Sequence, residues 1–497
     1  MISPHLLLGV DVGSSGVKAI LLHPSRGIVA SAKASVQQHS DRPGWSEADT
    51  AEWWSGFIST IPKLLNQAKA NSWDIRGIAF SGMVPALVAI NQDGTPVRRA
   101  ILQNDSRAVQ EIEEIKNSLS EFDSLTMVGS IPSQQWIAPT VLWLARYESE
   151  NFRNIKNIVG SYDWMAHALG AELHVEKNWA LESGLFTLND SVYHEIYDSI
   201  NVEWPNIPGI RRSGDQVGKV SSKASEETGL RAGTPIFVGG ADHVLSAYGA
   251  GLVDDGDVLI KLGGAGDILA VSKKLILSKE LYIDSHPIPN IWLPNGCMAT
   301  SGSILRWEQN LLNEKSLEKL DQEANLATPG SLLVLPYFLG EKTPLHDPLL
   351  RGAILGIHLG TTRGEIHRAI LESIAFGFRR HVEIFRNLNL NVNNIKITNG
   401  GSKSKLWKKI IADVLQLDVM SIVDHPGASF GAAICAGVGL GVFEDWEVGL
   451  KLIKPGEMIH HDLTQKTKYD LRYMEFIEAT DSLTTILHSI SGGQNEK

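Results

Sequence analysis

The amino-acid sequence predicts an α/β protein, and three observations support this class. Segments with strand and helix patterns alternate along the chain, which is typical of α/β architectures. An apolar strand, a glycine-rich tip and a second apolar strand follow one another at residues 6–22 and again at residues 257–271. The 497 residues are enough for about two to four domains. The recurrence suggests two homologous halves, although two such hairpins can also arise independently.

Composition and charge exclude several other classes. Hydrophobic residues make up 43% and charged residues 20% of the chain, so a disordered or collagen-like protein is excluded. A net charge of -11 argues against a nucleic-acid binder, which needs a basic surface. Cys297 and Cys435 are the only cysteines, so we expect no disulfide framework and a cytoplasmic protein. Neither a signal peptide nor a membrane helix is expected, because no basic region precedes the apolar N-terminal patch and no run of about 18 apolar residues occurs.

The first hairpin carries an unusual carboxylate. Apolar runs at residues 6–12 and 17–22 flank a Gly-Ser-Ser-Gly turn, which predicts a hairpin with a tight tip. Asp11 stands near the end of the first strand, where a buried carboxylate needs a partner or a metal. Asp11 could therefore bind Mg²⁺ directly or through a water, or accept N–H bonds from the turn. Lys18 either reaches a phosphate or faces solvent.

The remaining elements follow from caps, apolar periodicity and turns. Asp49 or Thr50 is expected to cap a helix that runs to about residue 70. The other expected elements are strands at residues 75–80, 87–90 and 236–238, and helices at residues 244–251, 406–415 and from 426 onward. Residues 491–497 are expected to be a disordered tail.

Glycine- and serine-rich turns at strand ends offer free backbone N–H groups, which is what a polyphosphate needs. Such turns occur at residues 13–16, 263–266 and 399–404. Neither the G-x-x-x-x-G-K-[ST] nor the G-x-G-x-x-G pattern is present, so the common P-loop and dinucleotide sites are excluded. We therefore expect a phosphate site assembled from hairpin tips. The alternative is that each turn is only a turn.

A second carboxylate stands at a glycine-rich strand end. Asp242 follows Gly-Gly-Ala, and His243 comes next. Asp242 could accept the proton of an attacking hydroxyl in phosphoryl transfer, which adds about 10²–10⁴-fold in rate. The alternative is an N-cap of the helix at residues 244–251, and both roles can hold together.

Two further polar clusters leave alternatives open. Asn104, Asp105 and Arg107 stand together after a strand, where they could hydrogen-bond a polyol or form an internal Asp–Arg ion pair. The segment His-His-Asp at residues 460–462 could bind a metal or form a solvated loop, and the loop is the more ordinary arrangement.

Taken together, these motifs resemble the FGGY family of carbohydrate kinases. The family's phosphate motif is matched by GVDVGSSGVK at residues 9–18 and its catalytic motif by GGADH at residues 239–243. Its C-terminal signature is matched across residues 352–372, after a similar segment at residues 335–344. The segment NGGSKSKLW at residues 399–407 resembles the adenosine-binding turn. The matches occur in family order over about residues 6–440.

The resemblance implies two actin-like, ribonuclease-H-like domains with ATP and sugar bound in an interdomain cleft. The implied limits are an N-terminal, sugar-binding domain at residues 1–247 and a C-terminal, nucleotide-binding domain at residues 248–490. ATP and Mg²⁺ are the implied cofactors, and a homodimer without a nucleic-acid or membrane partner is the implied assembly. Asp242 would be the catalytic base, and Asp11 and Asp242 would be the residues that hold Mg²⁺.

The resemblance also assigns the binding residues. The phosphate and ATP contacts that it implies are Gly13, Ser14, Ser15, Lys18, Gly263, Gly264, Ala265, Gly400, Gly401, Ser402 and Ser404. The sugar contacts that it implies are Met83, Val84, Gln103, Asp105, Asp242 and His243.

Within the family, the layout is most similar to the xylulokinase branch, from which three positions depart. That branch usually carries Met-His where this chain has Met83-Val84, and Asn after the catalytic Asp where His243 stands. It usually carries Thr where this chain has Gly264, which removes a hydroxyl near the γ-phosphate. The first two departures bear on the choice of sugar, and the third on the speed of transfer.

The leading hypothesis is an ATP-dependent kinase of a small sugar, a ketopentose of the xylulose or ribulose type. The alternatives are a kinase of another polyol or sugar acid (glycerol, erythritol or gluconate type) and a catalytically weak sensor of sugar and nucleotide. An actin- or chaperone-like ATPase with a protein partner is a third alternative. The presence of both Asp11 and Asp242 argues against the sensor, and the signature at residues 352–372 argues against the ATPase.

Overall fold

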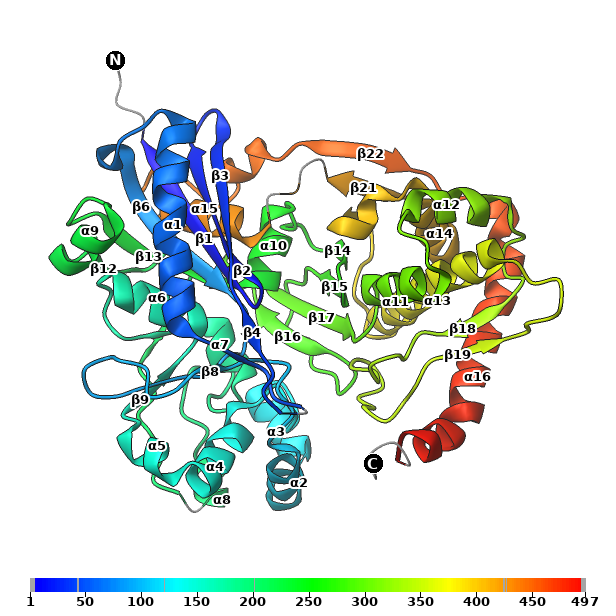
Figure 1. The fold of residues 1–497 in the computed structure, drawn as a ribbon, viewed down its shortest axis with the longest axis horizontal. Helices are drawn as coiled ribbons and strands as arrows, with labels where there is room; N and C mark the ends of the chain where they lie inside the picture. The colour runs from blue at the N-terminus through cyan, green and yellow to red at the C-terminus, as the bar shows by residue number, and fades with distance from the viewer. Residues whose placement is uncertain are drawn as a thin grey trace. The chain divides into compact units, whose positions relative to one another are not determined.

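The computed structural model describes residues 5–42, 44–119, 121–200, 202–422, 425 and 427–492. The chain divides into two compact units, and each unit has a large sheet with helices packed around it (Figure 1). Unit 1 consists of Met1–Gly251, Ile283–Trp292 and Pro426–Ile453, and unit 2 of Leu252–Tyr282, Leu293–His425 and Lys454–Lys497. The predicted α/β class is confirmed. The predicted domain limits at residues 247/248 and 490 stay predictions.

Unit 1 is built on a six-stranded sheet in the order β12-β13-β6-β1-β2-β3. Its strands are β1 (Leu6–Gly13), β2 (Gly16–His23), β3 (Gly27–Ser35), β6 (Ile75–Gly82), β12 (Gln216–Lys219) and β13 (Pro235–Ala241). Strands β1, β6 and β13 are parallel, whereas β1–β2–β3 is an antiparallel meander. β1 is a nearly continuous apolar run because it lies inside the sheet and is buried on both faces. The predicted first hairpin is confirmed.

Two helices from distant parts of the sequence cover this sheet. Helix α1 (Thr50–Ala68) contacts β2 and β3, and helix α15 (Ala428–Gly439) contacts β1, β6 and β13. Asp49 caps α1 as predicted, since its Oδ1 accepts a hydrogen bond from the Ala51 N–H at 2.8 Å. α15 comes so close to β1 that a Cβ added to Gly9 would lie 1.9 Å from the Ser429 carbonyl oxygen. The predicted small-residue helix after residue 426 is thus a structural part of unit 1.

The other elements of unit 1 are short. They are β4 (Gln38–His39), β5 (Glu47–Ala48), β7 (Val88–Ile90), β8 (Ala100–Ile101), β9 (Asn157–Val159), β10 (Val175–Glu176), β11 (Ile210–Arg211), α2 (Val109–Ser118), α3 (Glu121–Val128), α4 (Ile137–Tyr147), α5 (Ser149–Asn154), α6 (Ser161–Leu169), α7 (Lys177–Glu182), α8 (His194–Ser199), α9 (Ser222–Thr228), α10 (Asp242–Gly249), η1 (Ser72–Asp74) and η3 (Val448–Leu452). The expected strands at residues 75–80, 87–90 and 236–238 correspond to β6, β7 and β13.

The sheet of unit 2 repeats the strand scheme of unit 1. Its strands are β14 (Asp257–Leu262), β15 (Gly266–Ala270), β17 (Trp292–Met298), β20 (Asn394–Thr398), β21 (Val419–Ile422) and β22 (Pro455–Ile459). β14, β15 and β17 are antiparallel neighbours, and β14, β20 and β21 are parallel neighbours. The order β3-β2-β1-β6-β13 in unit 1 corresponds strand for strand to the order β17-β15-β14-β20-β21 in unit 2. Corresponding neighbours are antiparallel or parallel in the same way in both sheets. The suggested repetition is therefore present in the topology.

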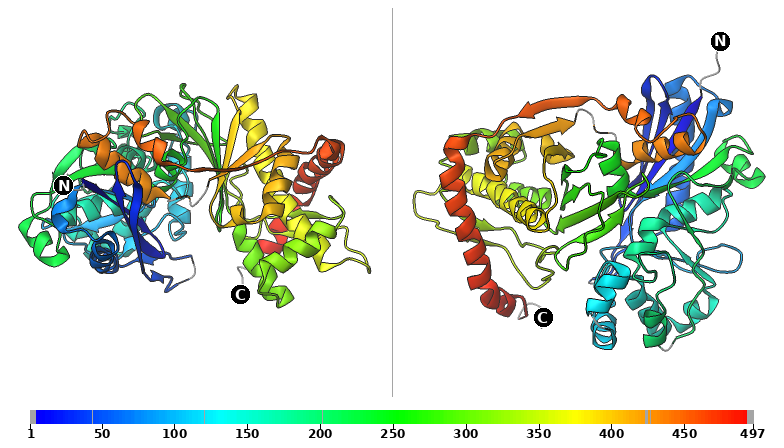
Figure 2. Two further views of the ribbon diagram at one scale, coloured as in Figure 1. Left: turned by 90° about the horizontal axis from the view of Figure 1, so that it is seen from above. Right: turned by 180° about the vertical axis from the view of Figure 1, so that it is seen from behind.

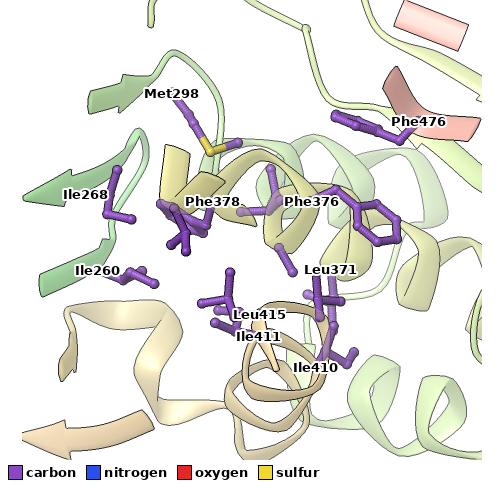
Figure 3. Packing of buried hydrophobic residues seen from close by; sticks show 14 of the residues in the cluster. Ile260, Ile268, Met298, Leu371, Phe376, Phe378, Ile410, Ile411, Leu415 and Phe476 are labelled. Atoms are coloured by element: carbon purple, nitrogen blue, oxygen red, sulfur yellow. The ribbon is translucent and has the colours of Figure 1, made fainter. Parts of the chain in front are cut away.

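The core of unit 2 forms around the long helix α13 (Arg363–Asn387). Leu371, Phe376 and Phe378 of α13 are buried, and Figure 3 shows them next to side chains of α14 (Lys405–Leu415) and of the sheet. α13 begins with a capping box, in which the Thr362 hydroxyl accepts from the Glu365 N–H and the Glu365 carboxylate accepts from the Thr362 N–H. Helix α16 (Lys466–Gly492) adds Phe476 to this core and lies at the periphery of unit 2 in all views (Figures 1 and 2).

The remaining elements of unit 2 are α11 (Gly302–Leu312), α12 (Leu317–Leu326), β18 (Leu333–Leu335), β19 (Ala353–Leu355), η2 (Gly400–Lys403) and η4 (Leu463–Gln465). β16 (Tyr282–Ser285) begins at the last residue of a unit 2 segment and continues into unit 1. Of the expected disordered tail, residues 491 and 492 end α16, and residues 493–497 lie outside the described residues. Both cysteines are free thiols. Among the described residues, no helix has the length and apolar character that a membrane span requires.

A buried ion triad in unit 2 predicts a pH-dependent stability. The His367 side chain is 0% exposed, and its ring nitrogens lie 2.7 Å from Glu308 Oε2 and 3.0 Å from Asp321 Oδ1. Burial by itself would lower the pKa of His367, but the two carboxylates outweigh it and raise the pKa to about 9. Because the folded-state pKa lies above the unfolded value, the stabilisation is complete below about pH 6.5 and is lost as the pH rises through about 9.

We therefore expect the wild-type free energy of unfolding to fall by about 3 kcal/mol between pH 6.5 and 9.5 through this group. Urea unfolding at several pH values measures the change, and His367→Gln is the matched control. The variant should be less stable at pH 6.5 and should show a flatter pH profile. Parallel profiles of the two proteins would contradict the prediction.

Candidate active site

The predicted site residues of unit 1 gather at one end of its parallel strands. In the sheet register, Asp11 of β1 lies beside Ser81 of β6, and Ser81 lies beside Gly240 of β13. Met83 and Asp242 follow these positions by two residues, just after their strands end. The carboxyl ends of parallel strands are where α/β folds place ligand-binding groups. The structure thus brings Asp11 and Asp242 to the same edge of one sheet.

Asp11 and Lys18 lie opposite each other on the first hairpin. Burial lowers the pKa of Lys18, and the negative charge of Asp11 acts in the opposite direction. Gly427 also lies close, since a Cβ added there would be 3.7 Å from Lys18 Nζ. Lys18 is therefore a half-buried cation beside the Asp11 carboxylate, rather than a lysine that simply faces solvent. Of the tip residues between them in sequence, Gly13 and Ser14 are half-buried and Ser15 is exposed.

Asp242 is the first residue of helix α10, and the N-cap position belongs to Ala241. The alternative in which Asp242 serves as the N-cap is wrong, because the helix begins two residues earlier than the apolar pattern predicts. The Asp242 side chain is 37% exposed. A carboxylate in the first turn of a helix is stabilised by the helix dipole and its free N–H groups. The position therefore combines a favourable local field with access for a substrate.

His243 lies in an acidic environment that sequence analysis missed. Its Nε2 is 2.7 Å from Asp284 Oδ2 and 3.8 Å from Glu182 Oε1, and its Nδ1 is 3.5 Å from Asp242 Oδ1. Burial opposes the charged form, but Asp284 above all, with Asp242 and Glu182, raises the pKa of His243 well above its ordinary value. Burial and the charge of Asp284 raise the pKa of Glu182. No sequence signal connects these residues, because they belong to separate elements.

The predicted sugar-binding residues that follow strand β6 have mostly buried side chains. The side chains of Met83 and Val84 are 3% and 1% exposed. The Met83 backbone donates to the Val12 carbonyl at 3.3 Å and accepts from the Ser161 hydroxyl at 3.2 Å. Gln103 is half-buried. Their contact with a sugar stays a prediction.

Asp105 and Arg107 form a buried ion pair, which is one of the two arrangements that sequence analysis left open. Arg107 donates to both Asp105 oxygens at 2.8 and 2.7 Å and to Glu47 at 2.7 Å. The Ser46 N–H adds a further hydrogen bond to Asp105 at 2.6 Å. The Arg107 guanidinium lies 3.8 Å from the ring centroid of Trp45, where a cation–π interaction adds to the pair. A direct sugar contact of Asp105 would require the displacement of one of these donors.

In unit 2 the structure brings the two predicted nucleotide turns together. A Cβ added to Gly263 would lie 3.5 Å from Asn399 Nδ2, and a Cβ added to Gly401 would lie 2.6 Å from Leu262 Cβ. The Gly264 carbonyl accepts hydrogen bonds from the Ser301 and Ser303 N–H groups at 2.8 and 3.1 Å, so the hairpin tip is fixed by its backbone. Ala265 completes this tip.

The serines of the second turn support its shape. The Ser404 hydroxyl caps α14 by accepting from the Trp407 N–H at 3.0 Å. The Ser402 hydroxyl donates to the Asn399 carbonyl at 2.6 Å. Contacts of either serine with a nucleotide stay predictions.

For two neighbouring glycines in this turn, the structure predicts effects of very different size from the same substitution to alanine. A Cβ at Gly401 would lie 2.5 Å from Trp407 Cζ3, whereas the described structure has no atom within 4 Å of a Cβ at Gly400. Gly401→Ala is therefore expected to destabilise unit 2 by about 1–3 kcal/mol and to weaken ATP binding. Gly400→Ala, the matched control, should change stability by less than about 0.5 kcal/mol. Urea unfolding and nucleotide titration test both, and equal effects would contradict the turn geometry.

The pair His460 and His461 does not form a metal site with Asp462. Both imidazoles instead bind Asp418, with His460 Nδ1 at 2.7 Å and His461 Nδ1 at 2.6 Å from its oxygens. Their hydrogen bonds lower the pKa of Asp418. Asp462 accepts from the Thr464 N–H as the cap of η4. Of the two alternatives, the solvated loop is the one that the structure has.

Comparison with known proteins identifies relatives over most of the chain. Two models of the FGGY family of carbohydrate kinases match, the N-terminal domain at residues 6–249 and the C-terminal domain at residues 271–440. A xylulose kinase of Staphylococcus xylosus is 27% identical over 446 residues, which are 88% of this chain and 91% of the relative. A xylulose kinase of Staphylococcus epidermidis is 28% identical over 499 residues, with 97% and 99% covered.

A solved structure agrees with these relatives. The crystal structure of a xylulose kinase from Rhodospirillum rubrum superposes with a TM-score of 0.90 and is 34% identical in sequence. The alignment covers 97% of this chain and 100% of that one. The similarity therefore extends over both units.

Proposed function

The chain belongs to the FGGY family of carbohydrate kinases and is an ATP-dependent sugar kinase, and we propose that its acceptor is a ketopentose of the xylulose or ribulose type. The observation that carries the proposal is the near-complete alignment with a xylulose kinase structure at 34% identity. The repeated strand scheme of the two units is that of an actin-like, ribonuclease-H-like fold.

We propose that Asp242 is the catalytic base. In this mechanism the acceptor hydroxyl oxygen attacks the γ-phosphorus of ATP, and the bond from that phosphorus to the β,γ-bridging oxygen breaks. ADP leaves, and the hydroxyl proton passes to the Asp242 carboxylate. The exposure of Asp242 and its place in the first turn of α10 support this role. Positioning and charge stabilisation supply most of the remaining acceleration.

The phosphates are proposed to bind to the two hairpin tips. Their backbone N–H groups suit phosphate oxygens because neither tip carries a bulky side chain. The residues proposed for this role and for the nucleotide are Gly13, Ser14, Ser15, Lys18, Gly263, Gly264, Ala265, Gly400, Gly401, Ser402 and Ser404. Since Gly264 has no hydroxyl, only its backbone can contact the γ-phosphate.

Mg²⁺ is proposed to bind near Asp11 and Asp242. Both offer carboxylate oxygens, the ligands that Mg²⁺ prefers, and they lie at one edge of the same sheet. Bound Mg²⁺ would offset the negative charge of the transferring phosphoryl group. The partly exposed Asp242 carboxylate suits a metal that keeps several waters.

The sugar is proposed to contact Met83, Val84, Gln103, Asp105, Asp242 and His243. The Val84 side chain cannot form a hydrogen bond with a sugar, whereas His243 carries an imidazole that Asp284 holds by a hydrogen bond. These two positions are therefore the ones expected to decide between ketopentoses and the alternative acceptors, namely glycerol, erythritol and gluconate.

Sugar-dependent ATP consumption by the purified protein tests the proposal. The panel contains D-xylulose, D-ribulose, L-ribulose, L-xylulose, glycerol, erythritol, gluconate and a control without acceptor, all with Mg²⁺. One strong response to a ketopentose is expected. A stronger response to glycerol, erythritol or gluconate would refute the acceptor class, and nucleotide binding without turnover on any acceptor would favour the sensor.

The resemblance also supports a cytoplasmic homodimer. Light scattering should then give twice the chain mass of 54.3 kDa. A single chain mass at micromolar concentration would refute the dimer.

A further inference from the structure

Three acidic side chains surround the imidazole of His243, and two of them have no part in the proposed chemistry. Asp284 is 1% exposed and its Oδ2 lies 2.7 Å from His243 Nε2. Glu182 is 14% exposed and its Oε1 lies 3.8 Å from the same nitrogen. Asp242 lies on the other side of the ring, with Oδ1 3.5 Å from Nδ1. The imidazole therefore lies between two groups: Nε2 faces Asp284 and Glu182, and Nδ1 faces the proposed base Asp242.

The carboxylates of Asp284 and Glu182 are held on elements that are fastened to each other. Glu182 ends helix α7, and Asp284 lies in β16. Asn178 of α7 joins the two elements, because its Oδ1 accepts from the Ser285 N–H at 2.7 Å and its Nδ2 donates to the Ser285 carbonyl at 3.0 Å. The Asn178 side chain is itself buried. Asp284 and Glu182 therefore form a fixed support for the ring.

This support determines which way the imidazole faces. Since Nε2 is bound to Asp284, a ring flip would break a short hydrogen bond to a buried carboxylate, which is costly. Nδ1 is consequently directed toward Asp242. The Asp242 side chain is 37% exposed, and its Oδ1 lies 3.5 Å from this nitrogen, so the orientation of the ring bears directly on the position of the carboxylate. A displacement of about 1 Å in a reacting group can cost about 10²-fold in rate.

We propose that Asp284, assisted by Glu182, is a positioning residue that orients His243 and thereby holds the Asp242 carboxylate in place to accept the proton of the sugar hydroxyl. This inference rests on the proposed function, since it assigns a task to Asp242 in that reaction. It adds two residues, Asp284 and Glu182, that the family motifs do not contain.

A double-mutant cycle tests the proposal. Asp284→Ala and His243→Ala are each expected to lower kcat by about 10–100-fold, with the KM for ATP nearly unchanged. Because Asp284 acts through His243, the double variant should lose no more than either single variant. Asp284→Asn keeps an acceptor oxygen for the Nε2–H and should retain more of kcat than Asp284→Ala does. Wild-type kcat in Asp284→Ala, or losses that multiply in the double variant, would overturn the proposal.

Two further measurements separate this inference from the proposed function and from misfolding. A crystal structure of Asp284→Ala should show the His243 ring turned away from Asp242, and an unchanged ring would overturn the proposal even if no acceptor sugar were known. Asp163→Asn is the matched control, because Asp163 is a buried carboxylate that faces His174 and Glu176 instead. Its kcat should match the wild type, and an equal loss there would show that any buried carboxylate has the same effect.

Discussion

Replacement of Asp242 by alanine is expected to lower kcat for sugar phosphorylation by about 10²–10⁴-fold, while ATP binding persists. The variant removes the proton acceptor at the strand end, but it leaves the hairpin tips of both units unchanged. Because Asp242 is partly exposed and its helix has Ala241 at the N-cap, the loss of the carboxylate should change stability little. Coupled-assay kinetics give kcat, and titration with a fluorescent ATP analogue gives the affinity.

Asp93→Ala is the matched control, since it removes an exposed carboxylate from a turn of unit 1. Its kcat should stay within about twofold of the wild type. Turnover that survives in Asp242→Ala would remove Asp242 from the role of base. A loss of ATP affinity equal to the loss of kcat would assign it to nucleotide binding instead.

The second large effect concerns stability. Asp105→Ala is expected to lower the free energy of unfolding by about 3–5 kcal/mol, because it leaves the Arg107 guanidinium buried with a smaller opposing charge. The Arg107 side chain is 1% exposed and that of Asp105 is 3% exposed, so water cannot replace the lost partner. Glu47 remains at 2.7 Å but already binds Arg98 as well. Urea unfolding followed by tryptophan fluorescence measures the change, since Trp45 lies over Arg107.

An exposed ion pair in the same unit provides the control. Asp41 lies 2.9 Å from Arg99, and their side chains are 67% and 38% exposed. Asp41→Ala should cost less than about 1 kcal/mol, because water screens the pair. A normal unfolding free energy in Asp105→Ala, combined with a raised KM for the sugar, would contradict the structural role and favour the predicted sugar contact.

Features that depend on neighbouring residues could be predicted from the amino-acid sequence alone. The first hairpin follows from two apolar runs around Gly-Ser-Ser-Gly, and the start of α1 follows from Asp49, because a turn and a cap need only a few adjacent residues. The motifs around Asp11 and Asp242 are equally local, and their order along the chain was sufficient to indicate the kinase family. The start of α10 was misplaced by two residues, since small residues give a weak apolar period.

Contacts between groups that lie far apart in the sequence required the folded structure. Helix α15 belongs to unit 1 although about 180 residues separate it from α10, because its small side chains allow close contact with β1. Asp284 pairs with His243 because the fold places the two side chains within hydrogen-bond distance. A buried charged group is stable only beside such a partner. For Asp105 and Arg107 the sequence left an ion pair and a sugar contact open, and the fold forms the ion pair by burying both residues among Ser46, Glu47 and Trp45. Such pairings depend on burial and on proximity in space, and one sequence contains no local pattern for either.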